Sequence, residues 1–363
     1  MTPPATGARR PRLGFLGTGW IGRNRLEAIA ADGAADVVAV SDPSPEAAAR
    51  AAAAAPGAAL VDSLDALLAL GLDGVVIATP SALHAAQAVA ALERGAAVFC
   101  QKPLARTAGE TRRVVAAARA ADRLLGVDLS YRETAAMRAV RGVVEGGELG
   151  RVYAVDLTFH NAYGPDKGWF YDPALAGGGC VIDLGIHLVD LALWTLRWPA
   201  LRGADVRLYS KGAPLGDPSR AVEDYAVATL DLEDPDGRPV TARLACSWHL
   251  SAGQDAVIEA AFYGERGGAA MRNVGGSFYD FVAERFEGTR RVRLAEPPDD
   301  GTAEPWGGRA AVAWARRLAA DPRFDADAER LVDVAAALDA VYGRVGGDGE
   351  ASAAEIGTAV GIH

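Results

Sequence analysis

Lys102 has a type and a place in the chain that suit proton transfer. Of the 37 basic residues only Lys102, Lys167 and Lys211 are lysines, and the rest are arginines. A desolvated lysine can give up its proton, whereas arginine stays protonated. Lys102 lies between the apolar run 98–100 and Pro103, which predicts a loop at the C-terminal end of a strand. Ligands of α/β sheets bind at that edge, so we expect Lys102 to be catalytic.

A glycine-rich turn is predicted between the first strand and the first helix, and it is suited to holding a phosphate. It fits the GxGxxG pattern, and its residues are Gly17, Thr18, Gly19, Trp20, Ile21 and Gly22. The first glycine of such a turn makes the tight bend, the second lets the backbone approach a pyrophosphate, and the third allows close helix packing. The helix N-terminus then offers unpaired N–H groups to the phosphates.

Asp42 follows the second predicted strand, 20 residues after Gly22. A carboxylate at that place binds the ribose hydroxyls of a dinucleotide, and it repels the 2′-phosphate of NADP. The next residue is Pro43 rather than an arginine that would accommodate that phosphate. Asp42 and the glycine-rich turn therefore predict NAD as the cofactor, with NADP less favoured. The alternative is a plain glycine turn beside a surface aspartate.

A second loop is predicted to run along the cofactor near its nicotinamide end. Thr79, Pro80 and Ser81 end another predicted strand and begin a helix, and His84 lies one turn further on. Two interpretations of His84 stay open. It is either a cofactor contact or a hydrogen-bonding and packing residue of the loop, and we predict no catalytic role for it.

Asp183 and His187 form the second group with a spacing suited to chemistry. They are four residues apart, so on a helix predicted over 183–196 they share one face. Three glycines at 177–179 precede them and would let the backbone approach a ligand closely. An aspartate can hold an imidazole in one tautomer while the imidazole moves a proton. A helix-surface contact or a metal pair is the alternative, but the sequence has no further ligand motif, so we predict no metal ion.

Composition and charge narrow the class of protein. The 363 residues are 50% hydrophobic and carry a formal net charge of −10, which argues against a nucleic-acid partner. Cys100, Cys180 and Cys246 are scattered and odd in number, which favours a reduced protein of the cytoplasm. No run approaches the ~20 apolar residues of a membrane span, which predicts no membrane partner. The pair Arg9-Arg10 is not followed by the apolar segment of an export signal.

The first part of the chain alternates short apolar strands with helical stretches, which is typical of a doubly wound parallel sheet of the Rossmann type. The predicted strands are Arg12–Leu16, Asp36–Val40, Gly74–Ala78, Ala97–Cys100 and Leu124–Val127. Residues 107–110 form a capping box that begins a helix just after the Lys102 loop.

Strands dominate after residue 131, and the turn at 234–237 predicts a hairpin. The predicted strands are Val152–His160, Val206–Tyr209, Tyr225–Leu232, Val240–Trp248 and Ala256–Tyr263. The predicted helices are Ala135–Glu145, Asp183–Leu196, Arg309–Ala319 and Ala326–Val341. This pattern indicates an α+β domain with a largely antiparallel sheet. We therefore divide the chain into a disordered lead-in (1–11), a dinucleotide-binding domain (12–130), a second domain (131–345) and a tail (346–363).

Taken together, these motifs resemble the Gfo/Idh/MocA oxidoreductase family, which includes glucose–fructose oxidoreductase and inositol dehydrogenase. The resemblance covers nearly the whole chain and rests on Gly17–Gly22, Asp42, residues 79–103, Tyr131-Arg132 and Trp169 through Asp190. It implies that Lys102 lies beside nicotinamide and substrate, and that Asp183 and His187 are paired in the substrate site. It also implies that the second domain binds substrate and has an open sheet that forms homo-oligomers, a dimer or a tetramer.

One departure from the family pattern lies next to Lys102. The usual Glu-Lys-Pro is here Gln101-Lys102-Pro103, which removes a carboxylate from the loop. We interpret the change as tuning, and we place Gln101 with Lys102 among the cofactor contacts. Arg132 and Trp169 are further candidates for the substrate pocket. The alternatives are a salt bridge at the domain interface for Arg132 and core packing for Trp169.

The resemblance implies an NAD-dependent enzyme that transfers a hydride between nicotinamide and a carbinol or ketone carbon of a sugar, cyclitol or related polyol. We expect His187 to be the acid and base at the reacting hydroxyl, oriented by Asp183. Lys102 would donate a hydrogen bond to the same oxygen, or would itself be the main proton carrier. The competing interpretations are a reductase of a non-sugar substrate such as an imine, and a non-catalytic nucleotide-sensing protein on the same fold.

Overall fold

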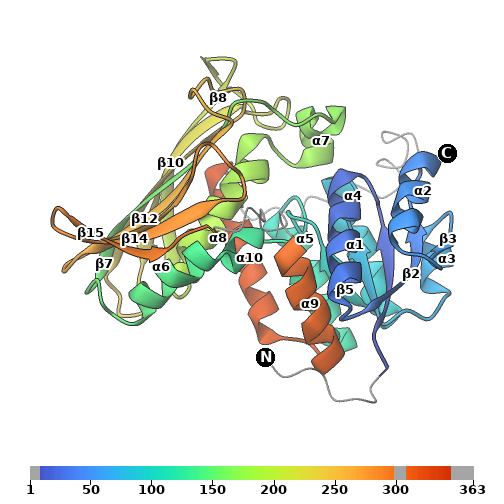
Figure 1. Cartoon of the computed structure of the whole chain (residues 1–363). Helices are drawn as coiled ribbons and strands as arrows, with labels where there is room; N and C mark the ends of the chain where they lie inside the picture. The colour runs from blue at the N-terminus through green and yellow to red at the C-terminus, as the bar shows by residue number, and fades with distance from the viewer. Residues whose placement is uncertain (1–8, 298–307, 345–363) are drawn as a thin grey trace.

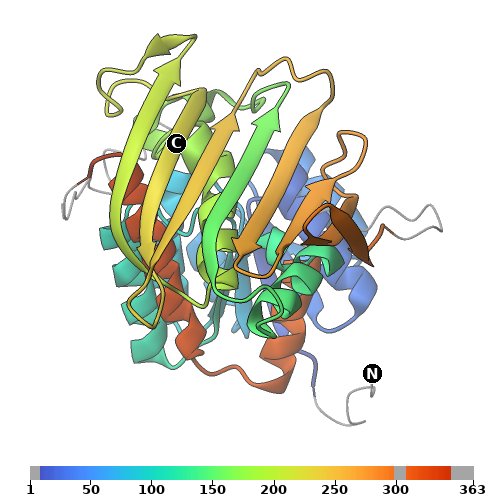
Figure 2. The same cartoon turned by 90° about the vertical axis from the view of Figure 1, so that its left-hand side faces the viewer.

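Two β-sheets organise the protein (Figure 1). The computed structural model describes residues 9–297 and 308–344, so most of the predicted lead-in and all of the predicted tail lie outside the described residues. The first sheet is parallel and lies between two layers of helices. The second is broader and mostly antiparallel, and among the described residues helices cover one of its faces (Figure 2). The predicted fold class is therefore confirmed.

The first sheet has six parallel strands in the order β3-β2-β1-β4-β5-β6. Their bounds are β1 Arg12–Leu16, β2 Asp36–Ser41, β3 Ala59–Leu60, β4 Gly74–Ile77, β5 Ala97–Cys100 and β6 Leu125–Val127. The strand order reverses between β1 and β4, and doubly wound sheets bind their ligands outside the carboxyl ends of the strands at such a point. All five predicted strands are present, and sequence analysis missed only the two-residue β3.

Helices cover both faces of this sheet and bury its apolar side chains in two separate clusters. They are α1 Trp20–Asp32, α2 Pro45–Ala54, α3 Leu64–Leu68, α4 Ser81–Glu93 and α5 Ala108–Ala121. The predicted helix start at α5 is confirmed, because the Thr107 hydroxyl accepts a hydrogen bond from the Glu110 N–H at 3.1 Å, although the return bond of the predicted capping box goes to the Arg106 N–H and not to the Thr107 N–H. The Glu110 carboxylate returns to the Arg106 N–H at 2.9 Å, which fixes the loop that follows Lys102.

The second sheet has nine strands in the order β15-β14-β13-β12-β7-β11-β10-β8-β9, and only the β11–β7 pair is parallel. The bounds are β7 Val152–Asn161, β8 Ala200–Ser210, β9 Ala213–Pro214, β10 Tyr225–Glu233, β11 Pro239–Ser247, β12 Ala256–Gly264, β13 Gly268–Asn273, β14 Phe281–Glu287 and β15 Arg290–Ala295. The prediction that this sheet is largely antiparallel is confirmed. Sequence analysis missed β9 and the three strands from β13 to β15.

One face of the second sheet is covered by helices (Figure 2). The elements between the sheets are the 3-10 turn Ser130–Glu133, α6 Ala135–Glu145, the 3-10 turn Gly168–Tyr171, α7 Pro173–Ala176, the π-helical turn Val181–Gly185 and α8 Ile186–Thr195. The segment Pro173–Thr195 is long and apolar enough to cross a membrane, but 89% of its most apolar window is buried. The apolar side chains of this segment therefore lie mostly inside the protein, as they do in a core helix.

The last helices bring the chain back to the first sheet (Figure 1). They are α9 Gly308–Ala320, the 3-10 turn Ala326–Glu329 and α10 Arg330–Val341. Trp314 of α9 packs against Phe99 of β5, with ring centroids 5.6 Å apart. A Cβ on Gly126 would lie 2.6 Å from this indole ring, and one on Gly74 would lie 2.8 Å from it. The predicted domain division stays a prediction, but α9 buries its apolar side in the core of the first domain.

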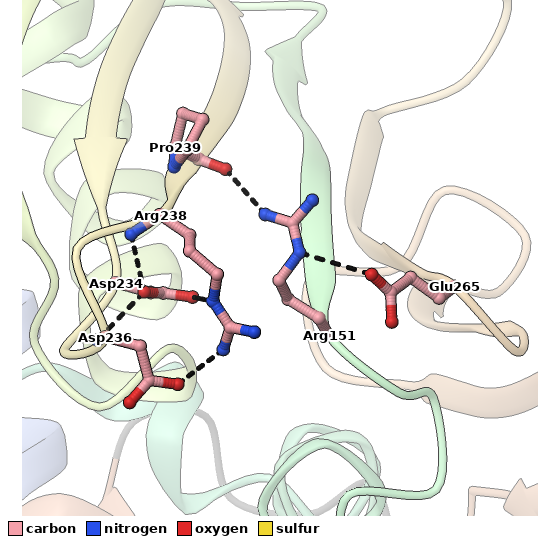
Figure 3. A network of polar contacts seen from close by, with 6 residues as sticks. All are labelled: Arg151, Asp234, Asp236, Arg238, Pro239 and Glu265. Carbon is pink, nitrogen blue, oxygen red and sulfur yellow. Dashed lines mark hydrogen bonds and ion pairs between the residues drawn. The ribbon is translucent and has the colours of Figure 1, made fainter.

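The hairpin between β10 and β11 has the predicted turn. The Asp234 carboxylate accepts hydrogen bonds from the N–H groups of Asp236 and Arg238, both at 2.9 Å. Figure 3 shows this turn beside Arg151, whose guanidinium donates to the Pro239 carbonyl at 3.1 Å and to Glu265 at 3.4 Å. Arg151 thereby links the start of β7 to the two neighbouring strand turns.

Gly126→Ala should destabilise the protein by about 1–3 kcal/mol, because the new methyl group has no room against the Trp314 ring. Gly142→Ala on α6 is the matched control. Nothing lies within 4 Å of a Cβ at that position, so the change should be neutral or slightly stabilising. Urea-induced unfolding of both variants measures the difference. Equal free energies of unfolding would contradict the role assigned to Gly126.

Candidate active site

The glycines of the turn between β1 and α1 serve different steric purposes. Gly17 has φ +82°, and a Cβ there would meet the Ala78 carbonyl oxygen at 2.6 Å. A Cβ on Gly22 would meet the Gly17 carbonyl oxygen at 2.1 Å. A Cβ on Gly19 would meet nothing within 4 Å. The first and third glycines therefore allow the turn and the helix to pack, while the second leaves the backbone open to a ligand.

The start of α1 and the end of β2 complete a site that fits NAD. The helix begins at Trp20, and no side chain of the described residues caps it. Its N–H groups are thus directed at the place where a pyrophosphate would lie. Asp42 lies beside the turn, since one carboxylate oxygen accepts a hydrogen bond from the Thr18 N–H at 2.6 Å and the other from the Ser44 N–H at 2.8 Å. Asp42 therefore lies just after β2 and beside the glycine-rich turn, and its contact with a ribose stays a prediction.

The loop after β4 is fixed by His84. Its Nε2 lies 2.7 Å from the Thr79 carbonyl oxygen, and its Nδ1 lies 2.7 Å from the Pro103 carbonyl oxygen. Burial is the main cause that lowers the pKa of His84, although both carbonyl contacts favour the protonated ring. The geometry thus gives His84 the local hydrogen-bonding role, and it ties the loop of Thr79, Pro80 and Ser81 to the loop of Lys102.

Lys102 reaches across to the second domain. Its Nζ donates to the Asp183 carboxylate at 2.5 Å and to the Asp183 carbonyl oxygen at 2.7 Å. The other carboxylate oxygen of Asp183 accepts a hydrogen bond from the Trp248 indole N–H at 3.0 Å. These contacts use two of the three donors of the ammonium group, so one N–H is left for a further acceptor.

His187 lies near this ion pair but is not hydrogen-bonded to Asp183 within the described part of the chain. Asp183 lies in a π-helical turn rather than in the predicted α-helix, so a spacing of four residues does not stack the two side chains. The His187 ring is 7% exposed, packs edge-on against Tyr131 and leaves Nδ1 buried without a partner there. Burial lowers the pKa of His187 well below 6.5, and the charges of Lys102 and Arg25 add to this effect.

The three glycines before Asp183 pack against the protein and not against an open space, which corrects the interpretation that they admit a ligand. A Cβ on Gly178 would lie 2.1 Å from the Tyr342 hydroxyl, and one on Gly179 would lie 1.9 Å from the Glu223 carbonyl oxygen. The buried Glu223 carboxylate accepts hydrogen bonds from the N–H groups of Gly179 and Val181 at 3.0 and 2.9 Å. Glu223 therefore anchors the turn that carries Asp183.

Arg132 and Trp169 have different surroundings. Arg132 makes a two-pronged ion pair with the buried Asp190 of α8, and its guanidinium lies over the Trp198 ring. Both prongs of its guanidinium are therefore used by a salt bridge inside the second domain, not by one at the domain interface, and its role as a substrate contact stays a prediction. Trp169 is partly exposed and stacks on Phe170, which in turn packs edge-on against Trp248. Trp169 thus contacts Phe170, which contacts Trp248, the residue that donates to Asp183. Because Trp169 is partly exposed, it is not a residue of the core.

Sequence analysis missed four residues of this region. Trp248 directly follows β11, and Tyr171 of the 3-10 turn Gly168–Tyr171 packs edge-on against it, but neither residue belongs to a sequence motif. Beneath Lys102, Arg25 and Asp128 form a buried ion pair and Gln101 donates to the same carboxylate. The described residues contain no group of three histidine, cysteine, aspartate or glutamate side chains that could hold a metal ion.

Comparison with known families agrees with this geometry. Residues 12–129 match the family model of an oxidoreductase family with an NAD-binding Rossmann fold, and residues 137–270 match that of the GFO/IDH/MocA C-terminal domain. The chain belongs to the Gfo/Idh/MocA family. The predicted family and the predicted NAD-binding domain are therefore confirmed.

Relatives and solved structures of the family extend this match. The chain is 29% identical over 215 residues to D-glucoside 3-dehydrogenase of Escherichia coli K12, which covers 56% of this chain and 60% of that protein. It is 30% identical to the rhizopine catabolism protein MocA of Rhizobium meliloti, over 72% of this chain and 82% of that protein. The structure of GenD2 from gentamicin A biosynthesis with NAD superposes with a TM-score of 0.75 at 25% identity, over 96% of this chain and 98% of that one.

Gly19→Ala should weaken NADH binding about tenfold or more, a loss of ~1.4 kcal/mol or more, without lowering stability. The new methyl group touches no described residue, and the residue already has φ −56°, so a bound pyrophosphate is the group that would meet it. Fluorescence titration with NADH and thermal unfolding measure the two effects. The Gly142→Ala control should bind NADH like the parent protein, and unchanged NADH affinity in Gly19→Ala would contradict the assignment of the turn.

Proposed function

We propose that this protein is an NAD-dependent dehydrogenase that acts on a carbinol or ketone carbon of a sugar, cyclitol or related polyol. The contact that carries the proposal is the ion pair between Lys102 and Asp183, beside the buried His187 at the carboxyl edge of the parallel sheet. Bound NAD supplies the hydride acceptor or donor. Relatives named glucoside and inositol dehydrogenases support a polyhydroxy substrate.

His187 is the proposed base at the reacting hydroxyl. Burial, Lys102 and Arg25 keep its pKa low, so the ring is neutral near pH 7 and ready to accept a proton. Its buried Nδ1 has no partner in the described structure, so Nε2 is the atom we assign to the hydroxyl. Asp183 orients the site through Lys102 and Trp248 instead of through His187.

Lys102 is the proposed donor to the reacting oxygen. Its third N–H is not used by Asp183, and a charged donor there stabilises the negative charge that develops on the alkoxide. Asp183 holds the ammonium group in place from two directions. This arrangement assigns proton transfer to His187 and charge stabilisation to Lys102.

Trp169, Phe170 and Trp248 are the proposed wall of the substrate pocket. The ring centroids of Trp169 and Phe170 lie 3.8 Å apart, and Trp248 binds the Asp183 carboxylate. Aromatic faces suit the C–H faces of a sugar ring, and the indole N–H fixes the carboxylate that holds Lys102. We also propose that the enzyme acts in the cytoplasm as a homo-oligomer, which its three free, buried cysteines and the helix-free face of its second sheet support.

Lys102→Met should lower kcat/KM by about 10²–10⁴-fold on a substrate found with a sugar and cyclitol panel, because the charged donor is lost. NADH binding should persist, as measured by fluorescence titration. Lys211→Met changes an exposed lysine and serves as the matched control. Full turnover by Lys102→Met would refute the role of Lys102. NADH binding by the parent protein without turnover of any polyol would favour the nucleotide sensor.

The rate of polyol oxidation should stay constant as the pH falls through 6.5 and decline only at lower pH, because the His187 ring stays neutral there. The stability of the folded protein should also decrease toward low pH. The unfolded chain takes up a proton near pH 6.5 before the folded protein does, so the free energy of unfolding decreases as the pH falls below that value. Profiles of kcat/KM and urea unfolding between pH 4 and 9 test both, and His187→Gln should remove this acid limb. An acid midpoint at or above 6.5 would count against a neutral buried base.

A further inference from the structure

A buried ion pair lies beneath the Lys102 loop. Asp128 follows β6 and is 1% exposed, while Arg25 lies on α1 and is 2% exposed. The Arg25 Nε lies 2.5 Å from one carboxylate oxygen of Asp128. The pair spans 103 residues and joins the helix that faces the cofactor phosphates to the carboxyl edge of the sheet. A charge pair withdrawn from water this far is costly unless further hydrogen bonds satisfy it.

Gln101 supplies such a hydrogen bond. Its Nε2 donates to the same oxygen of Asp128 at 2.7 Å, and Gln101 is 7% exposed. Both side chains bound to Asp128 donate to its Oδ2, which fixes the amide with its nitrogen toward Asp128. A glutamate at position 101 would instead put two carboxylates within hydrogen-bond distance in a buried site, where like charges repel strongly.

The position of the negative charge therefore depends on two residues together. The family motif has a glutamate before the lysine, whereas this chain has Gln101 there and the buried carboxylate of Asp128 just after the neighbouring strand β6. We propose that Asp128 provides the negative charge that the motif places at position 101, and that with Arg25 and Gln101 it acts as a positioning residue for Lys102 and His187. This inference rests on the proposed function for its kinetic part.

Asp128 affects the pKa of His187 by neutralising the charge of Arg25. The charged groups that act on His187 are the cations Lys102 and Arg25, and the rings of Tyr131 and Phe159 pack against it. Asp128 neutralises Arg25 and so limits its effect on the imidazole. Loss of the Asp128 charge should lower the pKa of His187 further and move the acid limb of the rate profile to lower pH.

A charge exchange tests the proposal with Gln101→Glu, Asp128→Asn and the double variant. Each single change should lower kcat/KM about tenfold or more, and Asp128→Asn should shift the acid limb downward. The double variant should recover kcat/KM to within about threefold of the parent, together with its pH profile, because one carboxylate and one amide again face Arg25. Gln254→Glu adds the same charge on an exposed loop and should change neither property.

The exchange is overturned if the double variant is no better than the worse single variant, or if Gln101→Glu keeps the parent's rate and pH profile. If the parent turns over no polyol, the proposed function fails instead. The proposal is then tested by urea unfolding and NADH affinity, where recovery in the double variant supports it, and a double variant no better than the worse single variant overturns it. If Asp128→Asn does not fold, a double variant that folds and has the parent's pH profile of kcat/KM still supports the proposal.

Discussion

The ion pair between Lys102 and Asp183 is the contact on which the arrangement of the two domains at the site depends. It joins a loop of the parallel sheet to a turn of the second domain across 81 residues of sequence. Other contacts hold each partner in place. His84 and Glu110 bind the loop that carries Lys102, and Trp248 donates a hydrogen bond to Asp183. An ion pair that is only partly exposed, with its charges bound on both sides, keeps its geometry better than a surface pair does.

Buried carboxylates support this ion pair on both sides of the domain boundary. Glu223 accepts two N–H groups of the turn before Asp183 as well as the Tyr342 hydroxyl at 2.7 Å, and burial raises its pKa. Asp128 plays the corresponding part beneath Lys102 with Arg25 and Gln101. Each of the two carboxylates leaves one oxygen buried without a partner in the described structure. Such groups carry a desolvation cost that packing elsewhere must offset, which is common where a structure positions reactive side chains.

Local signals in the sequence predicted the strands and the helix that surround the proposed cofactor site. The glycine turn, Asp42 and the strand of Lys102 depend on short runs whose sterics are complete within a few residues. The substrate half depends on register and depth, which no short run encodes. The helix through Asp183 contains a π-helical turn, so the expected pairing with His187 is replaced by contacts to Lys102 and Trp248. The pairing of Arg132 with Asp190 likewise depends on how the 3-10 turn Ser130–Glu133 packs against α8, which no short run of sequence encodes.

The first domain needs α9, which comes late in the chain, to complete its core. Trp314 fills the space that Gly74 and Gly126 leave open, and with Leu318 it is part of the same apolar cluster as β1 and β5. Residues 12–129 alone therefore lack part of their own core. During synthesis the cofactor domain remains incomplete until the ribosome has released the chain past α9. A protein cut short within its second domain would lose the integrity of its first, although that domain's own sequence was intact.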